Sequence, residues 1–437
     1  MFEGSEVPLN SNGVPSLPAK AGLGWRFRHL LIAPHRLGFF LAMVVLVVSG
    51  AWWLVVQLDR VSVTLSLVYT LSPTLVHAAV MTFGFIPLFF SGFLFTAGPK
   101  WLGLEPLQAQ MLLSPLLMQA TGWLLWVSGA HLHMLVALFG LALAWSGLTS
   151  VTWLFWRMVW RSRVTDKLHA YVLGLACLVG CATLGGVLAN LVVDANAAAM
   201  ACVLSGLWGF VVVIFVTASH RMIPFFTSGT LPLVSVWSPF WILGLMVCAA
   251  IFEGLAVWVE IDGPLHGPMA PVWMLGRGGF EVAAGCILLG VGRVWGQSQS
   301  MKSRLLAMLH IGFMWLGLAL VLGGFSQLMG LVQGTPVFSL GALHAVTIGC
   351  LASLMLAMVT RVSCSQSGRA LVADRVIWAL FWMVQLTALL RIAAAAHSAW
   401  ASWLLLPTAL VWAVTIVAWS LRLGTWYGQV RSDGRPG

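Results

Sequence analysis

Long apolar runs alternate with short polar connections along most of the chain. An uninterrupted apolar run of about 18 or more residues predicts a helix that crosses a bilayer. About twelve such runs occur, at residues 37–57, 75–97, 107–127, 133–156, 169–193, 199–219, 234–257, 272–295, 305–330, 337–360, 375–396 and 399–421. The sequence therefore predicts an all-α fold: a polytopic membrane helix bundle of about twelve transmembrane helices.

Two connections and one proline refine this pattern. The last two runs are joined by little more than "HSA", and the third and fourth by "SGAHLH", so each pair should form a tight helical hairpin. Pro87 lies inside the second run, between Gly84 and Gly92. A proline within a helix removes a hydrogen bond, so we expect this helix to kink near the middle of the membrane.

Composition supports a membrane environment. Of the 437 residues, 60% are hydrophobic and 8% are charged, whereas about 25% are charged in an average soluble chain. The chain therefore lacks the charged surface that a soluble fold of this length requires. No Walker, GxGxxG, HExxH or GxSxG motif stands in a supporting context, which argues against nucleotide or hydrolase chemistry.

The basic residues predict the orientation. Most of the 22 lysines and arginines lie in the terminal segments and in alternate connections, leaving Arg60, Arg277 and Arg391 for the other side. By the positive-inside rule, both termini are cytoplasmic. The net charge of +10 then reflects topology, and no basic patch interleaved with aromatic residues suggests nucleic-acid binding.

The domain organisation follows from the same pattern. Residues 1–33 are rich in proline, glycine and serine and predict a polar, mobile cytoplasmic tail without a cleavable signal sequence. Residues 34–423 form a single transmembrane domain, and residues 424–437 a short cytoplasmic tail. The seven cysteines include no CxxC pair, so we expect small hydrophobic side chains and no disulfides.

Histidines are the polar residues most in need of explanation. An imidazole within hydrocarbon is costly unless it has a hydrogen-bond partner or a ligand. With the predicted orientation, His77 and His344 lie toward the outer surface, and His35, His220 and His310 lie in the inner leaflet. Neutral imidazole is a common ligand of haem iron and copper. The alternative is a hydrogen bond to a backbone carbonyl or contact with a water-filled cavity.

The intramembrane arginines have two interpretations. Arg277 and Glu281 are four residues apart, so they can pair on one helix face. Arg391 has no carboxylate nearby in sequence, and either Glu253 or Glu260 or a haem propionate would serve as its anion. On the inner side, the same two interpretations apply to Arg221 and Arg361.

Three segments carry a family resemblance. They read "LVHAAVMTFGFIPLFFSGFLFTAGPKWLG", "SHRMIPFFTSG" and "ALHAVTIGCLASLMLAMVTRVSCSQSGRAL", and "HRLGFF" and "LHIGFMWLGLAL" accompany them. In this order and spacing, from about residue 34 to 396, they resemble the NnrS family of haem- and copper-containing membrane proteins. That family is associated with bacterial denitrification and relief of nitric oxide stress. The resemblance implies a multi-pass protein of the bacterial cytoplasmic membrane.

The resemblance also implies a cofactor. Histidine ligation is implied at His77, His344 and His310, with one or two haem b groups. In the family, the helix of His77 reads like H-A-H-E-M, whereas Ala79 and Val80 stand here in place of the second histidine and the acid; copper is therefore less well supported than haem. The residues expected to contact the cofactor are His77, His344, His310, His220, His35, Arg391, Arg361 and Arg221, with the first four as metal ligands.

Three classes of function follow. The first is a membrane haemoprotein that binds or reduces nitric oxide, as a nitric oxide reductase-like enzyme or a quinol-linked haem oxidoreductase. The second is a redox or nitric oxide sensor, or a metalloenzyme-assembly factor, without catalysis. The third is a transporter for a small anion or metal, for which twelve helices and Pro- and Gly-broken segments are typical.

Overall fold

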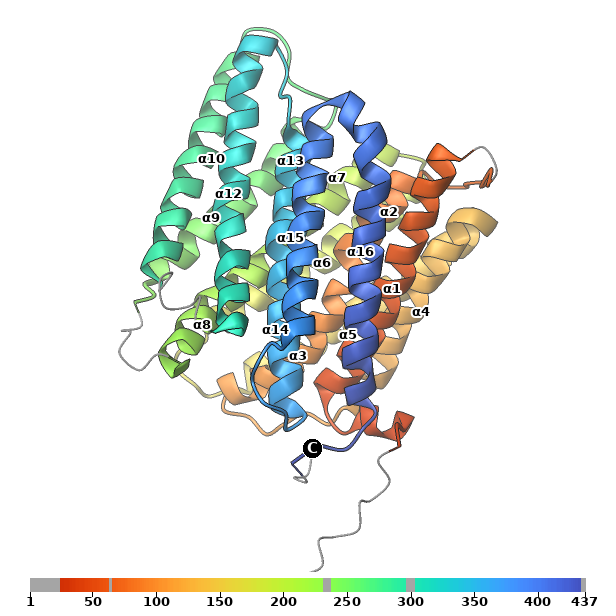
Figure 1. Ribbon diagram of the computed structural model, residues 1–437, viewed down its shortest axis with the longest axis vertical. Coiled ribbons are helices and arrows are strands. Elements are labelled where there is room, and N and C mark those ends of the chain that lie inside the picture. The colour runs from red at the N-terminus through yellow and green to blue at the C-terminus, as the bar shows by residue number, and fades with distance from the viewer. Residues whose placement is uncertain (1–23, 63–64, 231–236, 296–302, 434–437) are drawn as a thin grey trace, which may run out of the picture.

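Twelve membrane-length helical spans form the bundle shown in Figure 1. The computed structural model describes residues 24–62, 65–230, 237–295 and 303–433, and within these ranges the regular elements are all helical. The sequence-based prediction of an all-α polytopic bundle is confirmed.

The helices have the following bounds in chain order. They are a 3-10 helix η1 (Phe27–Leu31), then α1 (Pro34–Val61), α2 (Pro73–Phe83), α3 (Ile86–Trp101), α4 (Gln110–Leu132), α5 (Met134–Arg161), α6 (Leu168–Val192), α7 (Asn196–Gly206), the π-helix η2 (Leu207–Val212), α8 (Val213–Thr230), α9 (Phe240–Val259), α10 (Met269–Val294), α12 (Arg304–Gln333), α13 (Ser339–His344), the π-helix η3 (Ala345–Ala352), α14 (Ser353–Gln366), α15 (Arg375–Ala396) and α16 (Ser398–Tyr427).

Three spans are interrupted at mid-membrane. The second span breaks between α2 and α3 at Gly84 and Phe85, just before Pro87, so the predicted kink is confirmed. The sixth span contains η2, and the tenth contains η3 immediately after His344. π-Helical turns are rare and occur mostly at functional sites. Together with α12, these spans are the most deeply buried of the bundle.

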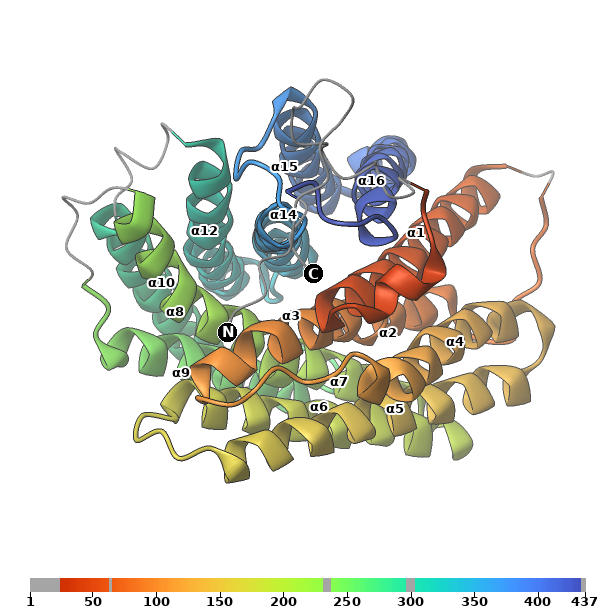
Figure 2. The same ribbon diagram turned by 90° about the horizontal axis from the view of Figure 1, so that it is seen from below.

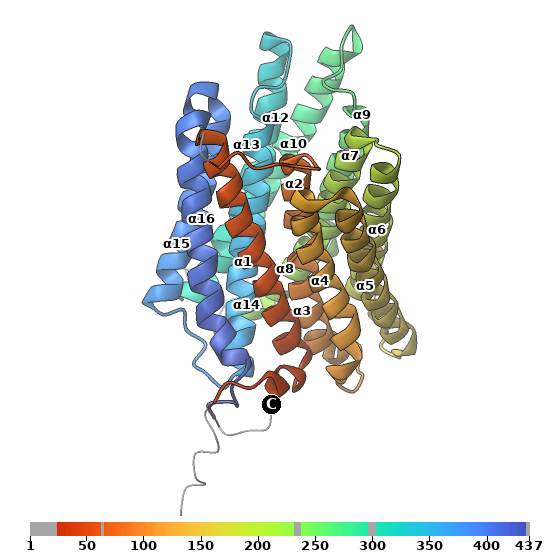
Figure 3. The same ribbon diagram turned by 90° about the vertical axis from the view of Figure 1, so that its right-hand side faces the viewer.

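The interrupted spans lie between two flanking groups of helices. Figures 2 and 3 show α15 and α16 on one side of the bundle and α5 and α6 on the other. Of the histidines on the interrupted spans, His220 is buried, and His77 and His344 are partly buried.

Both predicted hairpins are confirmed, and one histidine makes each turn. His133 separates α4 from α5, and His397 separates α15 from α16. Each histidine caps the second helix: Nδ1 of His133 accepts a hydrogen bond from the Leu135 amide at 3.1 Å, and Nδ1 of His397 accepts one from the Ala399 amide at 3.2 Å. The imidazoles at these helix ends thus satisfy amides that have no partner within the helix.

Glycines bring the backbones of α10 and α12 close together. A Cβ atom on Gly285 would lie 2.6 Å from the carbonyl oxygen of Gly317, and a Cβ atom on Gly317 would lie 2.9 Å from the carbonyl oxygen of Gly285. Gly278 and Gly324 form a second pair of the same kind. In a bilayer, helix association depends on such close packing, because lipid provides no hydrophobic driving force between helices.

The two chain ends meet at one face of the bundle, the lower end in Figure 1. Residues 24–33, which the sequence assigns to a mobile tail, instead pack against the carboxyl-terminal segment: the amide of Arg26 donates to the carbonyl oxygen of Gly428 at 2.8 Å, and Nδ1 of His29 donates to the same oxygen at 2.7 Å. Helix α16 continues to Tyr427, past residue 421, where the last apolar run ends, and past residue 423, the predicted end of the transmembrane domain. Residues 1–23 lie outside the described residues, and a cytoplasmic location of this face stays a prediction.

The glycine pairs predict a position-specific effect on stability. Gly285→Val should destabilise the bundle by about 1–3 kcal/mol, because the new side chain must force the α12 backbone away, and the midpoint of thermal denaturation of the detergent-purified protein should fall. Gly290→Val, on the same helix, is the matched control because no atom lies within 4 Å of its added Cβ. Equal midpoints for the two variants would contradict this account of the α10–α12 contact.

Candidate functional site

Three residues predicted from the sequence lie on helices α2, α13 and α15, which Figure 1 draws in the upper half of the bundle or extends into it. His77 comes from α2, His344 from the end of α13, and Arg391 from α15. The charges of His344 and Arg391 act on the His77 ring, and that of Arg391 acts on His344. We call His77, His344 and Arg391 the upper group.

His344 is oriented by its own helix. Its Nδ1 lies 2.7 Å from the carbonyl oxygen of Leu340, and because a carbonyl only accepts, Nδ1 carries the proton of the neutral ring. Nε2 is then the lone-pair nitrogen. A hydrogen bond from one ring nitrogen to a backbone carbonyl is the usual arrangement for a histidine whose other nitrogen binds a metal.

His77 is held mainly by ring contact. It stacks on Trp53 of α1 with ring centroids 3.8 Å apart and an interplanar angle of 19°. The same indole lies 5.2 Å from the guanidinium carbon of Arg60. Nδ1 of His77 is buried and has no hydrogen-bond partner among the described residues. A buried, unpaired ring nitrogen is unfavourable, so this nitrogen is available for a hydrogen bond or a ligand.

Arg391 makes no ion pair within the described part of the chain. The expectation that Glu253 or Glu260 neutralises it is wrong, because both carboxylates bind Arg277 instead. The sequence could not distinguish these partners, since all of the groups lie on helices whose facing sides are set only by packing. An arginine without a carboxylate, near two histidines, leaves the position for an external anion open.

The histidines near the lower face do not form one site. Nδ1 of His220 lies 3.1 Å from Nε2 of His169, and Nε2 of His220 lies 3.2 Å from the carbonyl oxygen of Pro239. Both ring nitrogens of His220 are thus engaged. Sequence reasoning missed His169 because it begins a helix 51 residues away along the chain, and only the contact between α6 and α8 brings it to His220.

His310 lies between two backbone carbonyl groups. Nδ1 lies 3.0 Å from the carbonyl oxygen of Leu306, and Nε2 lies 3.0 Å from the carbonyl oxygen of Trp295. The ring is buried between these two acceptors. A neutral ring has one N–H and donates it to one of these carbonyls, which is the backbone-bonded alternative that the sequence left open. A metal-binding role of His310 stays a prediction.

His35, Arg221 and Arg361 are dispersed. His35 is buried, and its Nδ1 has no hydrogen-bond partner in the part of the chain that the structure describes. The ring of His35 instead meets that of Phe39 edge to face. The guanidinium carbon of Arg221 lies 5.0 Å from the centre of the Trp101 ring, and that of Arg361 lies 3.9 Å from the centre of Phe226. Aromatic faces therefore receive both guanidinium groups.

An apolar cavity lies in the bundle interior between α1, α3, α8 and α14. All of its walls are hydrophobic, and its lining residues are Phe39, Ile86, Phe89, Phe90, Phe93, Ile214, Phe215, Ala218, Met355, Met358, Val359 and Val362. Ile86 follows His77 by nine residues on the same span, beyond the break at Gly84 and Phe85, so the cavity lies on the other side of that break from His77. Such a chamber suits a small, weakly polar molecule.

The upper group fits the needs of a haem better than those of a multi-ligand metal centre. Within residues 24–433, outside the short gaps, no group of three or more His, Cys, Asp or Glu residues is placed to hold a metal ion. Haem iron requires only one or two imidazoles from the protein, because the macrocycle supplies the remaining equatorial ligands. A free Nε2, an unpaired imidazole nitrogen and an unneutralised guanidinium are the features that agree with this requirement.

Comparison with known proteins assigns the family. A search among curated proteins finds no match to this chain. The profile described as NnrS protein matches residues 29–431, which include every interrupted span and all three residues of the upper group. The resemblance noted in the sequence is confirmed, and the chain belongs to the NnrS family, membrane proteins related to nitric oxide stress.

Proposed function

We propose that the protein is a membrane haemoprotein that acts in nitric oxide stress, with His344 and His77 as the iron ligands of a haem b in the upper group. The observation that carries the proposal is the orientation of His344, whose Nδ1–H bond to Leu340 leaves Nε2 as a ligand nitrogen. The buried, unpaired nitrogen of His77 supports the same site. A bound haem would supply the iron at which nitric oxide binds or through which an electron passes.

Arg391 contributes the electrostatics of the proposed site. Its guanidinium is always charged and can bind a carboxylate through two parallel hydrogen bonds. Because the described residues provide no carboxylate for it, we assign it to a haem propionate. This assignment accounts for both the cost of an arginine in the bundle and the lack of a counterion among the described side chains.

The two histidines have different tasks. His344 is fixed by a hydrogen bond within its own turn, at the start of the π-helical segment η3, so it is the permanent ligand. His77 is restrained by stacking on Trp53 and lacks a hydrogen bond from any described group at Nδ1, so it would be the more weakly held of the two haem ligands. A haem held by both imidazoles would supply electron transfer, and one held by His344 alone would supply a binding position for nitric oxide.

The apolar cavity provides the route for nitric oxide. Its phenylalanine and methionine side chains, of which Phe89 and Met355 are typical, offer no hydrogen bond to water or ions. A small, weakly polar gas partitions into such an interior and reaches the upper group from within the bundle.

Haem content should depend on the two histidines to different degrees. His344→Phe should reduce the haem-to-protein ratio of the purified protein at least several-fold, because the fixed ligand is lost. His77→Phe should retain haem through His344. It should also bind nitric oxide faster than the unmodified protein, as measured by the rate at which the Soret band shifts after nitric oxide is added. His266→Gln, in an exposed connection, is the control and should behave like the unmodified protein.

Two results would contradict this assignment. The first is an unchanged haem-to-protein ratio in both the His344 and the His77 variants. The second is a colourless, iron-free protein that still protects cells against nitric oxide. Haem-free protein that catalyses ligand uptake into liposomes would favour the transporter class instead.

Arg391 should influence the redox midpoint potential. Removing a positive charge close to the iron destabilises the reduced form, so Arg391→Gln should lower the midpoint potential by on the order of tens of millivolts. Arg293→Gln, an exposed change near the carboxyl end of α10, should leave the potential unchanged. A spectroelectrochemical titration in which the two variants coincide would remove Arg391 from the site.

A further inference from the structure

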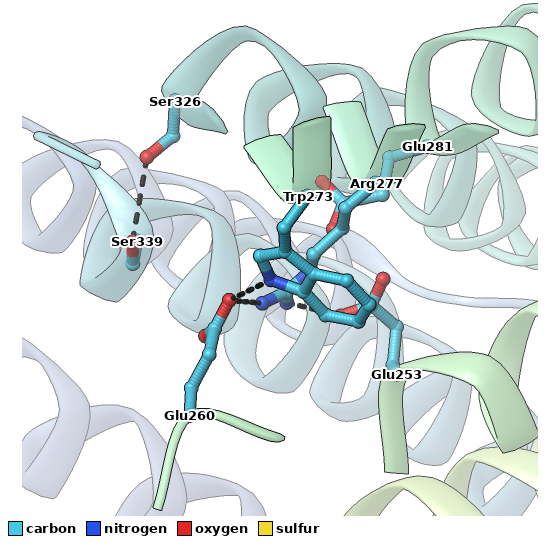
Figure 4. Close-up of polar contacts among 7 residues, drawn as sticks. All are labelled: Glu253, Glu260, Trp273, Arg277, Glu281, Ser326 and Ser339. Atoms are coloured by element: carbon cyan, nitrogen blue, oxygen red, sulfur yellow. Dashed lines mark hydrogen bonds and ion pairs between the residues drawn. The ribbon is translucent and has the colours of Figure 1, made fainter. Parts of the chain in front are cut away.

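A second polar cluster lies on α9 and α10, apart from the upper group (Figure 4). The guanidinium of Arg277 contacts three carboxylates: Nη2 donates to Glu253 at 2.6 Å, Nη1 to Glu260 at 2.7 Å, and Nε to Glu281 at 2.7 Å. The predicted pairing of Arg277 with Glu281 is confirmed, but two further acids share the same cation.

The charges of this cluster do not balance. One guanidinium faces three carboxyl groups, so full ionisation would leave a net charge of −2. The side chains of Glu253 and Glu281 are only 4% and 2% exposed, whereas that of Glu260 is 26% exposed. Two excess negative charges among buried side chains on membrane-spanning helices are strongly unfavourable, and the cluster must therefore take up a positive charge.

Two carboxyl oxygens are the positions at which the cluster can take up this positive charge. Oε1 of Glu253 and Oε2 of Glu281 are buried and receive no hydrogen bond from any described group. The two carboxyl groups contact the same guanidinium, through Nη2 and Nε of Arg277, which holds them close to each other. Two ionised carboxylates are both acceptors, so a hydrogen bond between them requires one proton.

Among the described residues, no other titratable group competes for this position. The charges that act on Glu281 are those of Glu253 and Arg277, and those that act on Arg277 are the three glutamates. Facing the cluster, α12 presents Gly323, where an added Cβ would lie 2.6 Å from Oε2 of Glu281 and 3.7 Å from Ala342 of α13. The nearest titratable residue on α13 is His344, two residues after Ala342.

The remaining described neighbours of the cluster are neutral. Helix α7 contributes Ser205, which accepts a hydrogen bond from Trp258, and η2 places Trp208 beside Gly254. The titratable residues of α12, Arg304 and His310, lie toward its other end: His310 precedes Gly323 by thirteen residues, or about 20 Å of helix. Within the described part of the chain, the acid pair is therefore electrostatically isolated from everything except Arg277 and Glu260.

We propose that Glu253 and Glu281 form a proton-binding site in which the two buried carboxyl groups share one exchangeable proton. Arg277 holds both carboxyl groups in place. Glu260, which is partly exposed and also accepts a hydrogen bond from Nε1 of Trp273 at 2.7 Å, connects the pair with the aqueous surface. Gly323 leaves the space that the unpaired oxygen of Glu281 occupies. The site is independent of haem binding.

Infrared spectroscopy of the full-length purified protein tests the site directly. We expect the C=O stretching band of a protonated carboxylic acid at neutral pH, with a shift to lower frequency in D2O. Glu281→Gln and Glu253→Gln should each remove this band. Glu105→Gln, which alters an exposed acid in a connecting loop, should leave it unchanged.

The outcomes distinguish a shared proton from a bound metal cation. Absence of the band in the unmodified protein, or its persistence in both glutamine variants, overturns the proposal. A band that appears only when sodium is replaced by choline assigns the site to a metal cation and likewise overturns it. If the glutamine variants do not fold, Gly323→Ala serves instead: its methyl group abuts Glu281 and should shift the band, and an unshifted band contradicts the assignment.

Discussion

A polar group inside a bilayer core must find its partner within the protein, because the lipid offers none. This constraint separates the histidines of the bundle into two kinds. In His310 and His220, each ring nitrogen lies within 3.2 Å of a carbonyl oxygen or a second imidazole. His77 keeps a buried nitrogen without a partner among the described residues, and His344 has its proton fixed on the nitrogen that faces its own helix. Residues of the second kind are the ones suited to bind a ligand.

The interruption of the central helices serves the same site. A regular helix satisfies its own carbonyls, whereas a π-helical turn shifts the register and reorients the side chains that follow. Here η3 begins directly after His344, and the break before Pro87 comes two turns after His77. The surrounding spans stay regular and pack through small residues, so the irregular backbone is confined to the protein interior, where it can be hydrogen-bonded.

The upper group and the Arg277 cluster use charge in opposite ways. Arg391 is a cation without an anion among the described side chains, whereas Arg277 has more carboxylates than one cation can neutralise. We propose a partner from outside these side chains for each arrangement: an anionic cofactor in the first case and a proton in the second. Gly323 of α12 and Ala342 of α13 lie between the Arg277 cluster and the upper group, because α12 separates Glu281 from the helix that carries His344.

The sequence by itself determined the all-α membrane bundle, the two hairpins, the kink before Pro87 and the family, because each depends on local hydrophobicity, on backbone restriction or on short motifs. From the sequence, His77, His344 and Arg391 could be predicted only to lie on the same side of the membrane, and not to form one group. Tertiary structure alone decided that Glu253 and Glu260 bind Arg277, that His169 meets His220, and that His310 faces two carbonyls. These contacts depend on the rotation of each helix about its axis, which packing sets and apolar periodicity leaves undefined in a bundle that is hydrophobic on every side.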